Sequence, residues 1–190
     1  MPLNNQKSYS DNGIFFIPGI FLGYPHWREG RMQIHIIAVG KIKEEFLRVG
    51  VAEYEKRLRP YLNLKVVELT EEKRSASASP SAEKTAIVKE GERILATVPT
   101  GAHVIALDIG GASWSSLELA GFLRLRELAG KNQITFIIGG DLGLSPKVLS
   151  QSDMQLSFSK MTFTHQMARL LLMEQIYRAC RINSGEPYHK

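Results

Sequence analysis

The chain has 190 residues, of which 44% are hydrophobic, and a formal net charge of +5 at pH 7. This length supports one well-buried core and leaves no room for a second catalytic domain. The basic balance is compatible with a polyanionic partner, and the single Cys180 excludes a disulfide framework and a paired-thiol metal site. A cytoplasmic, reducing compartment fits this cysteine usage.

Residues 1–31 differ in composition from everything that follows. Turn-forming residues occur throughout, and the only apolar run, residues 14–22, is interrupted by Pro18 and is too short to span a bilayer. The run also lacks the basic region before it and the small-residue cleavage site after it that a secretory signal has. We therefore expect a poorly ordered N-terminal extension or leader, one domain over residues 32–190, and no membrane association.

From Met32 onward, strand and helix patterns alternate. Short β-branched apolar runs predict strands, and longer segments with apolar residues three and four positions apart predict helices. The predicted strands cover residues 34–39, 64–69, 104–108, 134–138 and 154–158. The predicted helices cover residues 44–58, 82–97, 116–129, a short stretch after Pro146, and 164–182. This alternation predicts an α/β domain with a mostly parallel sheet flanked by helices, and the Ser-rich, charged residues 70–84 predict a loop that is mobile in its middle.

Two of the predicted strands run into glycine-rich segments, LDIGG at residues 107–111 and IIGGDLG at residues 137–143. In open α/β sheets, ligands bind beyond the carboxyl ends of the strands, where glycine lets the backbone approach a ligand closely. Neither segment matches a dinucleotide or phosphate-binding loop pattern. A nucleotide-sized ligand and a pair of ordinary tight turns both fit. For Asp108, the alternatives are a general base, a metal ligand and an acceptor that stabilises a turn, the last being the commonest.

The sequence has neither the histidine and carboxylate patterns of a metal site nor that of a serine nucleophile. The five histidines form no H-x-x-x-H pair and no carboxylate cluster accompanies them, so we predict no metal. No G-x-S-x-G segment is present to display a serine nucleophile, which argues against hydrolysis.

The last predicted helix carries a stripe of side chains at helical spacing. These are Met167, Leu170, Leu171, Glu174, Arg178 and Arg181. The stripe is apolar at first and ionic at its end, which suggests an interface with a charged rim or cleft; an ordinary surface salt bridge between Glu174 and Arg178 is the alternative. Basic residues outnumber acidic ones from Met154 to Lys190.

Six strings carry a resemblance to a known family: VGKIKEEF, EYEKRL, LDIGG, IIGGDLGLS, LSFSKMTFTHQMARLLLMEQIYRA and the terminal PYHK. In this order, from Met32 to Lys190, they resemble the RlmH family, the bacterial large-subunit (23S) ribosomal RNA pseudouridine N3-methyltransferases of the SPOUT class. The resemblance implies an α/β sheet whose C-terminal part forms a trefoil knot, which composition and periodicity do not predict. It further implies a homodimer, S-adenosylmethionine bound in the knot, and ribosomal RNA as substrate.

The resemblance also implies site residues. The cofactor-binding positions fall on Leu107, Gly139, Phe158, Ser159, Lys160, Met161, Thr162 and Phe163. Because the acceptor N3 must lose its proton, a base or an anion-stabilising group should lie beside the methyl group. The candidates are His189 as base or orienting group, Tyr188, and Arg178 as a contact to an anion or a phosphate.

The chain departs from the family pattern at two places. Thr164 stands where proline is common, which we expect to loosen the start of the last helix. Gly111 or Ala112, depending on the alignment of LDIGG, stands where lysine is common, so a positive charge near the cleft is missing.

Two other functions remain open at this point. One is a SPOUT-class enzyme that acts on tRNA, and the other is a ribosome-binding factor without catalysis. The glycine-rich segments and the PYHK tail disfavour the factor, and the absence of an appended RNA-binding domain disfavours the tRNA enzyme. Such a small chain must recognise RNA through its dimer surface, so we expect the assembled ribosome to be a better substrate than naked rRNA.

Overall fold

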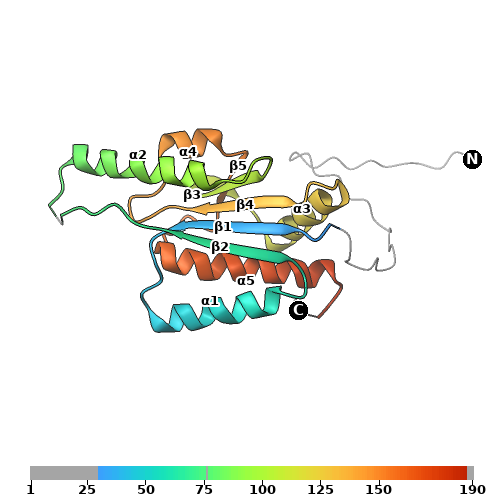
Figure 1. Ribbon diagram of the computed structural model, residues 1–190. Helices are drawn as coiled ribbons and strands as arrows, with labels where there is room; N and C mark the ends of the chain where they lie inside the picture. The colour runs from blue at the N-terminus through green and yellow to red at the C-terminus, as the bar shows by residue number, and fades with distance from the viewer. Residues whose placement is uncertain (1–29, 76, 188–190) are drawn as a thin grey trace, which may run out of the picture.

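The structure is a computed structural model that describes residues 30–75 and 77–187 (Figure 1). Five parallel strands form one sheet in the order β2-β1-β4-β3-β5. The strands are β1 (Gln33–Val39), β2 (Asn63–Leu69), β3 (His103–Ser113), β4 (Gln133–Ile138) and β5 (Met154–Ser157). All five predicted strands are therefore confirmed, and β3 is five residues longer at its carboxyl end than the sequence pattern indicated.

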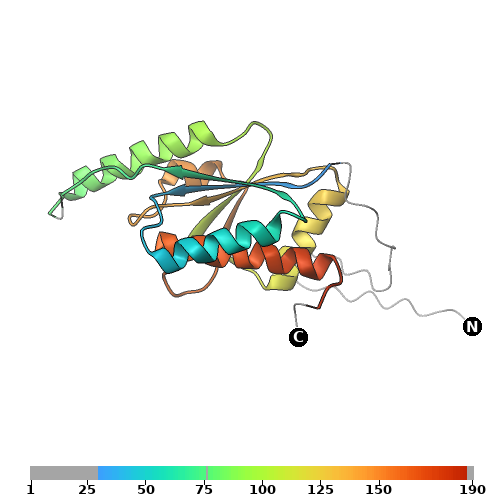
Figure 2. The same cartoon turned by 60° about the horizontal axis from the view of Figure 1, so that its bottom comes forward.

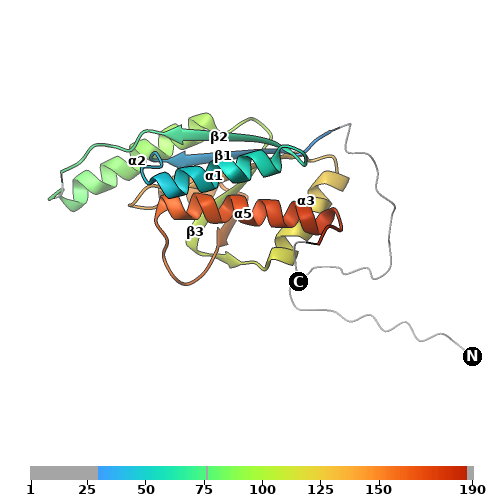
Figure 3. The same ribbon diagram turned by 90° about the horizontal axis from the view of Figure 1, so that it is seen from below.

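Helices cover both faces of the sheet (Figures 1 and 2). They are α1 (Glu45–Leu58), α2 (Pro80–Thr97), α3 (Ser116–Leu128), α4 (Pro146–Gln151) and α5 (His165–Asn183). Seen from below, α1 and α5 run side by side across one face, with α3 beside the C-terminal part of α5 (Figure 3). Helices α2 and α4 cover the other face, so the predicted α/β architecture is confirmed.

The continuous apolar runs follow from burial on both faces. Along β1, Ile34 and Ile36 belong to the core beneath α1, α3 and α5, whereas Ile37 belongs to the smaller core beneath α2 and α4. On the central strand β4, Phe136 pairs in register with both Ile36 and Ile105. Each such side chain contributes roughly 1.5–3 kcal/mol when removed from water, so the sheet centre is the most strongly stabilised part of the fold.

The helix starts have side-chain caps where the sequence provides them. Ser115 and Glu118 form a reciprocal capping box at α3, and Ser79 and Ser145 cap α2 and α4 ahead of a proline. Helix α1 has no such cap of its own. Instead, the side chain of Gln166 at the start of α5 accepts a hydrogen bond of 2.7 Å from the backbone N–H of Lys43. The start of α1 is therefore fastened to the start of α5.

Most of the predicted leader, residues 1–29, lies outside the described residues. Of the remainder, Arg31 donates hydrogen bonds of 3.3 Å to the backbone carbonyls of Arg59 and Pro60. None of the described helices is long and apolar enough to cross a bilayer. The trefoil knot stays a prediction, because strand order and pairing alone do not establish threading.

Candidate active site

A small hollow opens between the middle of β3 and the carboxyl end of β5, beside the first turn of α5. Its volume is about 140 Å³, and its walls come from β3, β5, the connection to α5, and Ala168. Six of the eight cofactor positions implied by the resemblance line it: Leu107, Phe158, Ser159, Met161, Thr162 and Phe163. The fold thus brings together residues that are about fifty positions apart in the sequence.

A second hollow of about 350 Å³ adjoins the first and shares four of its lining residues, among them Phe158 and Phe163. Its other walls include Trp114 at the end of β3 and Leu171 and Gln175 on α5. The smaller hollow is below the usual size of a small-molecule site, whereas the second lies within that range. Together they form one continuous apolar region with hydroxyl groups at its edge.

Two predicted cofactor positions, Gly139 and Lys160, do not line the first hollow. Gly139 follows directly on Ile138, which pairs in register with Leu107, so it lies at the same edge of the sheet. A Cβ at Gly139 would come within 2.6 Å of the backbone carbonyl of Gly143. The tight turn itself therefore requires this glycine. Lys160 is exposed in the connection between β5 and α5.

The LDIGG segment is not a turn at the end of a strand, as the sequence pattern indicated. It lies inside β3, where the pairing with β5 shifts register between Leu107 and Ala112 and then resumes. A Cβ at Gly111 would lie 2.6 Å from the backbone of Gln155 and Leu156, so a residue with a side chain does not fit. Asp108 accepts a hydrogen bond of 2.8 Å from the N–H of Gly110, which confirms its expected role in stabilising the local backbone.

The segment before α5 is held by short local hydrogen bonds. Ser157 donates to the carbonyl of Ser159 at 2.9 Å, and the hydroxyl of Ser159 accepts from the N–H of Met161 at 2.8 Å. Thr164 is the N-cap of α5, and its hydroxyl accepts from the N–H of Met167 at 3.2 Å. Its φ of −61° is already the value that proline would impose. A side-chain cap thus stands where the family has proline, and the expected loosening of the helix start stays a prediction.

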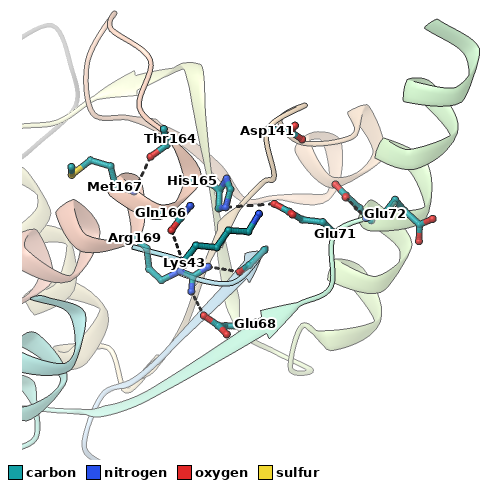
Figure 4. Close-up of polar contacts among 12 residues, drawn as sticks. Lys43, Glu68, Glu71, Glu72, Asp141, Thr164, His165, Gln166, Met167 and Arg169 are labelled. Atoms are coloured by element: carbon teal, nitrogen blue, oxygen red, sulfur yellow. Dashed lines mark hydrogen bonds and ion pairs between the residues drawn. The ribbon is translucent and has the colours of Figure 1, made fainter. Parts of the chain in front are cut away.

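The first turn of α5 also holds the ends of β1 and β2 (Figure 4). Arg169 is completely buried, forms an ion pair with Glu68 at 2.5 Å, and donates a hydrogen bond of 2.8 Å to the carbonyl of Gly40. Nε2 of His165 lies 3.5 Å from a carboxylate oxygen of Glu71. A Cβ at Gly40 would collide with both of these side chains, at 2.6 and 2.7 Å. The missing side chain of Gly40 thus makes the contact between His165 and Glu71 possible.

This cluster was missed by the sequence analysis, although a signal for Arg169 existed. At helical spacing, Arg169 lies on the same face of α5 as Leu172, Met173 and Ile176, which are completely buried. Burial lowers the pKa of His165, and the neighbouring Glu71 opposes this in part. The imidazole is therefore neutral at pH 7. Its place beside Gly40 and Glu71 suits a role in holding the backbone where β1 and β2 end.

Of the predicted catalytic residues, only Arg178 lies within the described part of the chain. Arg178 binds Glu174 through Nε and Nη2, at 2.9 and 2.7 Å, which confirms the expected pair. It follows Ala168 by ten residues, about 15 Å along the helix, and lines neither hollow. Tyr188 and His189 lie outside the described residues.

The last described residues are anchored at the far end of α5. Glu186 forms an ion pair of 2.6 Å with Arg181 and accepts hydrogen bonds of 3.1 Å from the hydroxyl of Tyr61. The helix from Ala168 to Asn183 is about 22 Å long, whereas the three residues from Glu186 to His189 span at most about 11 Å. Glu186 is therefore held at the opposite end of α5 from the first hollow.

The sequence was compared with known proteins. A family model described as "Predicted SPOUT methyltransferase" matches residues 32–189. The ribosomal RNA large subunit methyltransferases H of Carboxydothermus hydrogenoformans and Halothermothrix orenii are 52% and 51% identical to this chain over 159 residues. A protein of Methanoregula boonei, which has the same name with a provisional prefix, is 59% identical over 159 residues.

Each of these three alignments covers 84% of this chain and 100% of the relative. The matched region coincides with the α/β domain predicted to begin at Met32, and residues 1–31 lie outside it. The match contains both the hollow-lining segments of β3 and β5 and the whole of α5. The chain belongs to the SPOUT methyltransferase family, and within it resembles the ribosomal RNA large subunit methyltransferases H throughout their length.

Proposed function

We propose that this protein transfers a methyl group from S-adenosylmethionine to N3 of a pseudouridine in large-subunit (23S) ribosomal RNA. The acceptor is presented by the assembled ribosome in the cytoplasm, and the enzyme acts as a homodimer. The observation that carries this proposal is the full-length match to proteins named ribosomal RNA large subunit methyltransferase H. It is supported by the convergence of six implied cofactor positions on one hollow.

The residues around the two hollows fit the cofactor chemically. Leu107, Phe158 and Phe163 offer apolar surface for an adenine ring, and Ser159 and Thr162 offer hydroxyls to its polar groups. Gly139 and Lys160 complete the proposed set at the same edge of the sheet. When bound, the cofactor supplies an electrophilic methyl group on its sulfonium. The protein's task is to hold donor and acceptor in line, because positioning accounts for much of the rate of such a displacement.

The acceptor nitrogen has to lose its proton for the methyl group to be transferred. We propose that His189 is the base that accepts this proton and that Tyr188 orients it. Arg178 binds the resulting anion or a neighbouring phosphate. The anchoring of the tail favours a site shared between two chains, because His189 follows Glu186 by three residues and Glu186 is held at the opposite end of α5 from the first hollow. Each hollow would then receive the tail of the partner, which makes dimerisation necessary for catalysis.

The surface around the first hollow is suitable for such a dimer. Met161, Ile109 and Phe163 are large apolar side chains with 74, 55 and 43% of their surface exposed. On α5, Met167, Leu171 and Arg178 from the predicted stripe are only half-buried. Exposed apolar side chains rimmed by charged ones are typical of protein–protein interfaces.

The first test is calorimetric titration with S-adenosylmethionine, followed by mass mapping of methylated RNA. Heat of binding and a label on large-subunit rRNA are expected. The absence of binding would instead favour a non-catalytic ribosome-binding factor, and a label on tRNA would favour a SPOUT-class tRNA enzyme. Poorer methylation of an isolated stem-loop than of the assembled ribosome is expected, and equal rates would contradict recognition of the assembled particle.

The second test is complementation between two inactive chains. Thr162→Trp blocks the hollow, and His189→Ala removes the proposed base. Each variant alone is expected to be inactive, whereas co-expression of differently tagged chains in equal amounts should restore about one quarter of wild-type activity, since half the dimers are mixed and each has one complete site. No recovery, while the His189→Ala chain still binds S-adenosylmethionine, would argue against a shared site.

A further inference from the structure

A large hollow lies at the amino ends of β3, β4 and β5, at the opposite end of these strands from the proposed active site. It has a volume of about 510 Å³ and is lined by the start of β3, the end of α3 and the loops that precede β4 and β5. Its side chains are almost entirely polar; those used below are His103, Arg126, Lys131, Asn132 and Asp153. Nothing in the proposed methyl transfer uses this site.

Two cations face this hollow without a partner. Within residues 30–75 and 77–187, the side chains of Arg126 and Lys131 form neither an ion pair nor a hydrogen bond. The Nε–H donor of Arg126 is moreover buried and unpaired. A buried donor without an acceptor is unusual in a folded protein, because it has lost its hydrogen bond to water. The guanidinium of Arg126, which carries this donor at the wall of the hollow, is suited to an external acceptor.

The nearby acidic group is already engaged. Asp153 accepts a hydrogen bond of 2.7 Å from the backbone N–H of Val104, and its carboxylate lies 3.5 Å from Nδ1 of His103. Three of the last four carbonyls of α3, which would repel an anion, already accept hydrogen bonds from the backbone N–H groups of residues 129–131. Two cations therefore face one carboxylate whose hydrogen-bonding capacity is partly used, and the hollow favours an anion.

We infer that this hollow binds a backbone phosphate of the RNA substrate, with Arg126 and Lys131 as the phosphate ligands. The inference rests on the proposed function, since it names a place where the RNA of that reaction is held. A guanidinium presents N–H donors in a plane that matches phosphate oxygens, and an ammonium adds a point charge. The polar walls give no apolar surface on which a base could stack, so the contact is to the backbone.

The position of the hollow suits an extended RNA. His103 at its wall and Leu107 at the proposed cofactor site are four residues apart on β3, which is about 13 Å. An RNA longer than a few nucleotides spans this distance, and phosphate contacts remote from the target base fix the register of the complex without reading sequence. The site thereby supplies part of the recognition that a separate RNA-binding domain provides in larger enzymes.

The test compares Lys131→Ala and Arg126→Ala with the control Lys56→Ala, which removes the same charge from an exposed position on α1. Binding of a fluorescein-labelled hairpin from large-subunit rRNA is measured by anisotropy over a series of KCl concentrations. Each test variant should weaken binding about threefold to tenfold at low salt and lower the slope of log Kd against log salt by about one. The control should leave the slope unchanged.

Further measurements distinguish failure of the phosphate site from failure of the proposed function. Thermal midpoints and S-adenosylmethionine affinity, measured on the same full-length chains, should match those of the wild type. If Arg126→Ala unfolds, Lys131→Ala alone provides the test. Equal slopes for Lys131→Ala and Lys56→Ala would overturn the phosphate site even if the wild type methylates rRNA. An altered slope in a protein that methylates no rRNA would support the site and refute the proposed function.

Discussion

Arg169 of α5 and Glu68 of β2 form an ion pair in which the guanidinium is completely buried while 38% of the carboxylate side chain is exposed. The pair connects the helix that follows the proposed cofactor segment to the strand at the edge of the sheet. The same guanidinium donates to the carbonyl of Gly40 at the end of β1. One buried cation thus fixes the position of α5 relative to two strand ends.

The two partners are therefore expected to respond differently to substitution. Glu68→Ala leaves a buried cation without its counter-charge and should lower the free energy of unfolding by about 3 kcal/mol. This is the low end for broken buried pairs, because 38% of the Glu68 side chain is exposed. Arg169→Met removes the charge and should cost less. Adding Arg169→Met to Glu68→Ala should recover part of the free energy of unfolding measured by urea titration. A double variant less stable than either single variant would contradict this account.

Gly111→Ala should be strongly destabilising, because its Cβ would lie 2.6 Å from the backbone of β5. We expect a loss of at least about 2 kcal/mol and weaker S-adenosylmethionine binding, since β3 and β5 form the proposed hollow. Gly121→Ala in α3 is the matched control, because nothing lies within 4 Å of its Cβ. It should gain roughly 0.5–1 kcal/mol from helix propensity. Urea unfolding that ranks the two substitutions equally would refute this reading of β3.

Thr164→Ala removes the hydroxyl that caps α5 and should cost about 1 kcal/mol. Thr164→Pro loses the same hydrogen bond but fits the observed φ of −61°, and the lower entropy of its unfolded chain offsets part of the loss. Thr164→Pro should therefore be the more stable of the two in thermal melts. The reverse order would show that the backbone at Thr164 does not suit proline.

Stability should fall as the pH drops through the ordinary titration range of histidine. Burial is the main cause that lowers the pKa of His35, His103 and His165. The unfolded chain then binds more protons than the folded one between the lowered values and the ordinary value of 6.5, so the free energy of unfolding rises with pH in this window. Burial raises the pKa of Glu90, which acts in the opposite direction above 4.5.

The variant His165→Gln isolates one contribution to this pH dependence. It should reduce the slope of unfolding free energy against pH by at most about 0.7 kcal/mol per unit near pH 6.5, and by at most about 1.4 kcal/mol per unit at lower pH, where the unfolded imidazole is fully protonated. Urea titrations at several pH values measure the slope. An unchanged slope would mean that the pKa of His165 is the same in the folded and unfolded chains.

Cys180 should be unreactive in the folded protein. Burial raises the pKa of its thiol to about 12, and the thiolate is the reactive form. We expect no labelling by iodoacetamide at pH 8 under native conditions and one label per chain after unfolding in urea. Rapid native labelling would show that the C-terminal part of α5 opens locally.

The sequence predicted the elements well because burial on both faces of a parallel sheet leaves continuous apolar runs. The strand at residues 134–138 and the helix at residues 44–58 differ from the observed elements by one residue. The extension of β3 was missed because Gly110 and Gly111 suggest a turn, whereas here they allow β3 to bulge and return to β5. Strand order depends on contacts between distant segments, which periodicity does not encode.

The site was less accessible to sequence reasoning than the fold. Residues 107 and 158–163 were assigned only through the family resemblance, and the structure explains their proximity by the pairing of β3 with β5. The cluster of His165, Arg169 and Glu68 was missed because Glu68 lies about a hundred positions from α5. Arg126 and Lys131 belong to no motif, and their significance depends on a hollow that only the folded chain has.

In the proposed dimer, the anchoring of Glu186 by Tyr61 and Arg181 connects Tyr61 to the active site of the other subunit. Tyr61 lies in the connection between α1 and β2 and is part of the scaffold in a single chain. In the proposed dimer it also holds Glu186, the residue from which the proposed base His189 would be presented to the other subunit. A Tyr61→Phe allele would therefore leave its own subunit's hollow intact and impair its neighbour's, and co-expressed with wild type it would lower activity in mixed dimers.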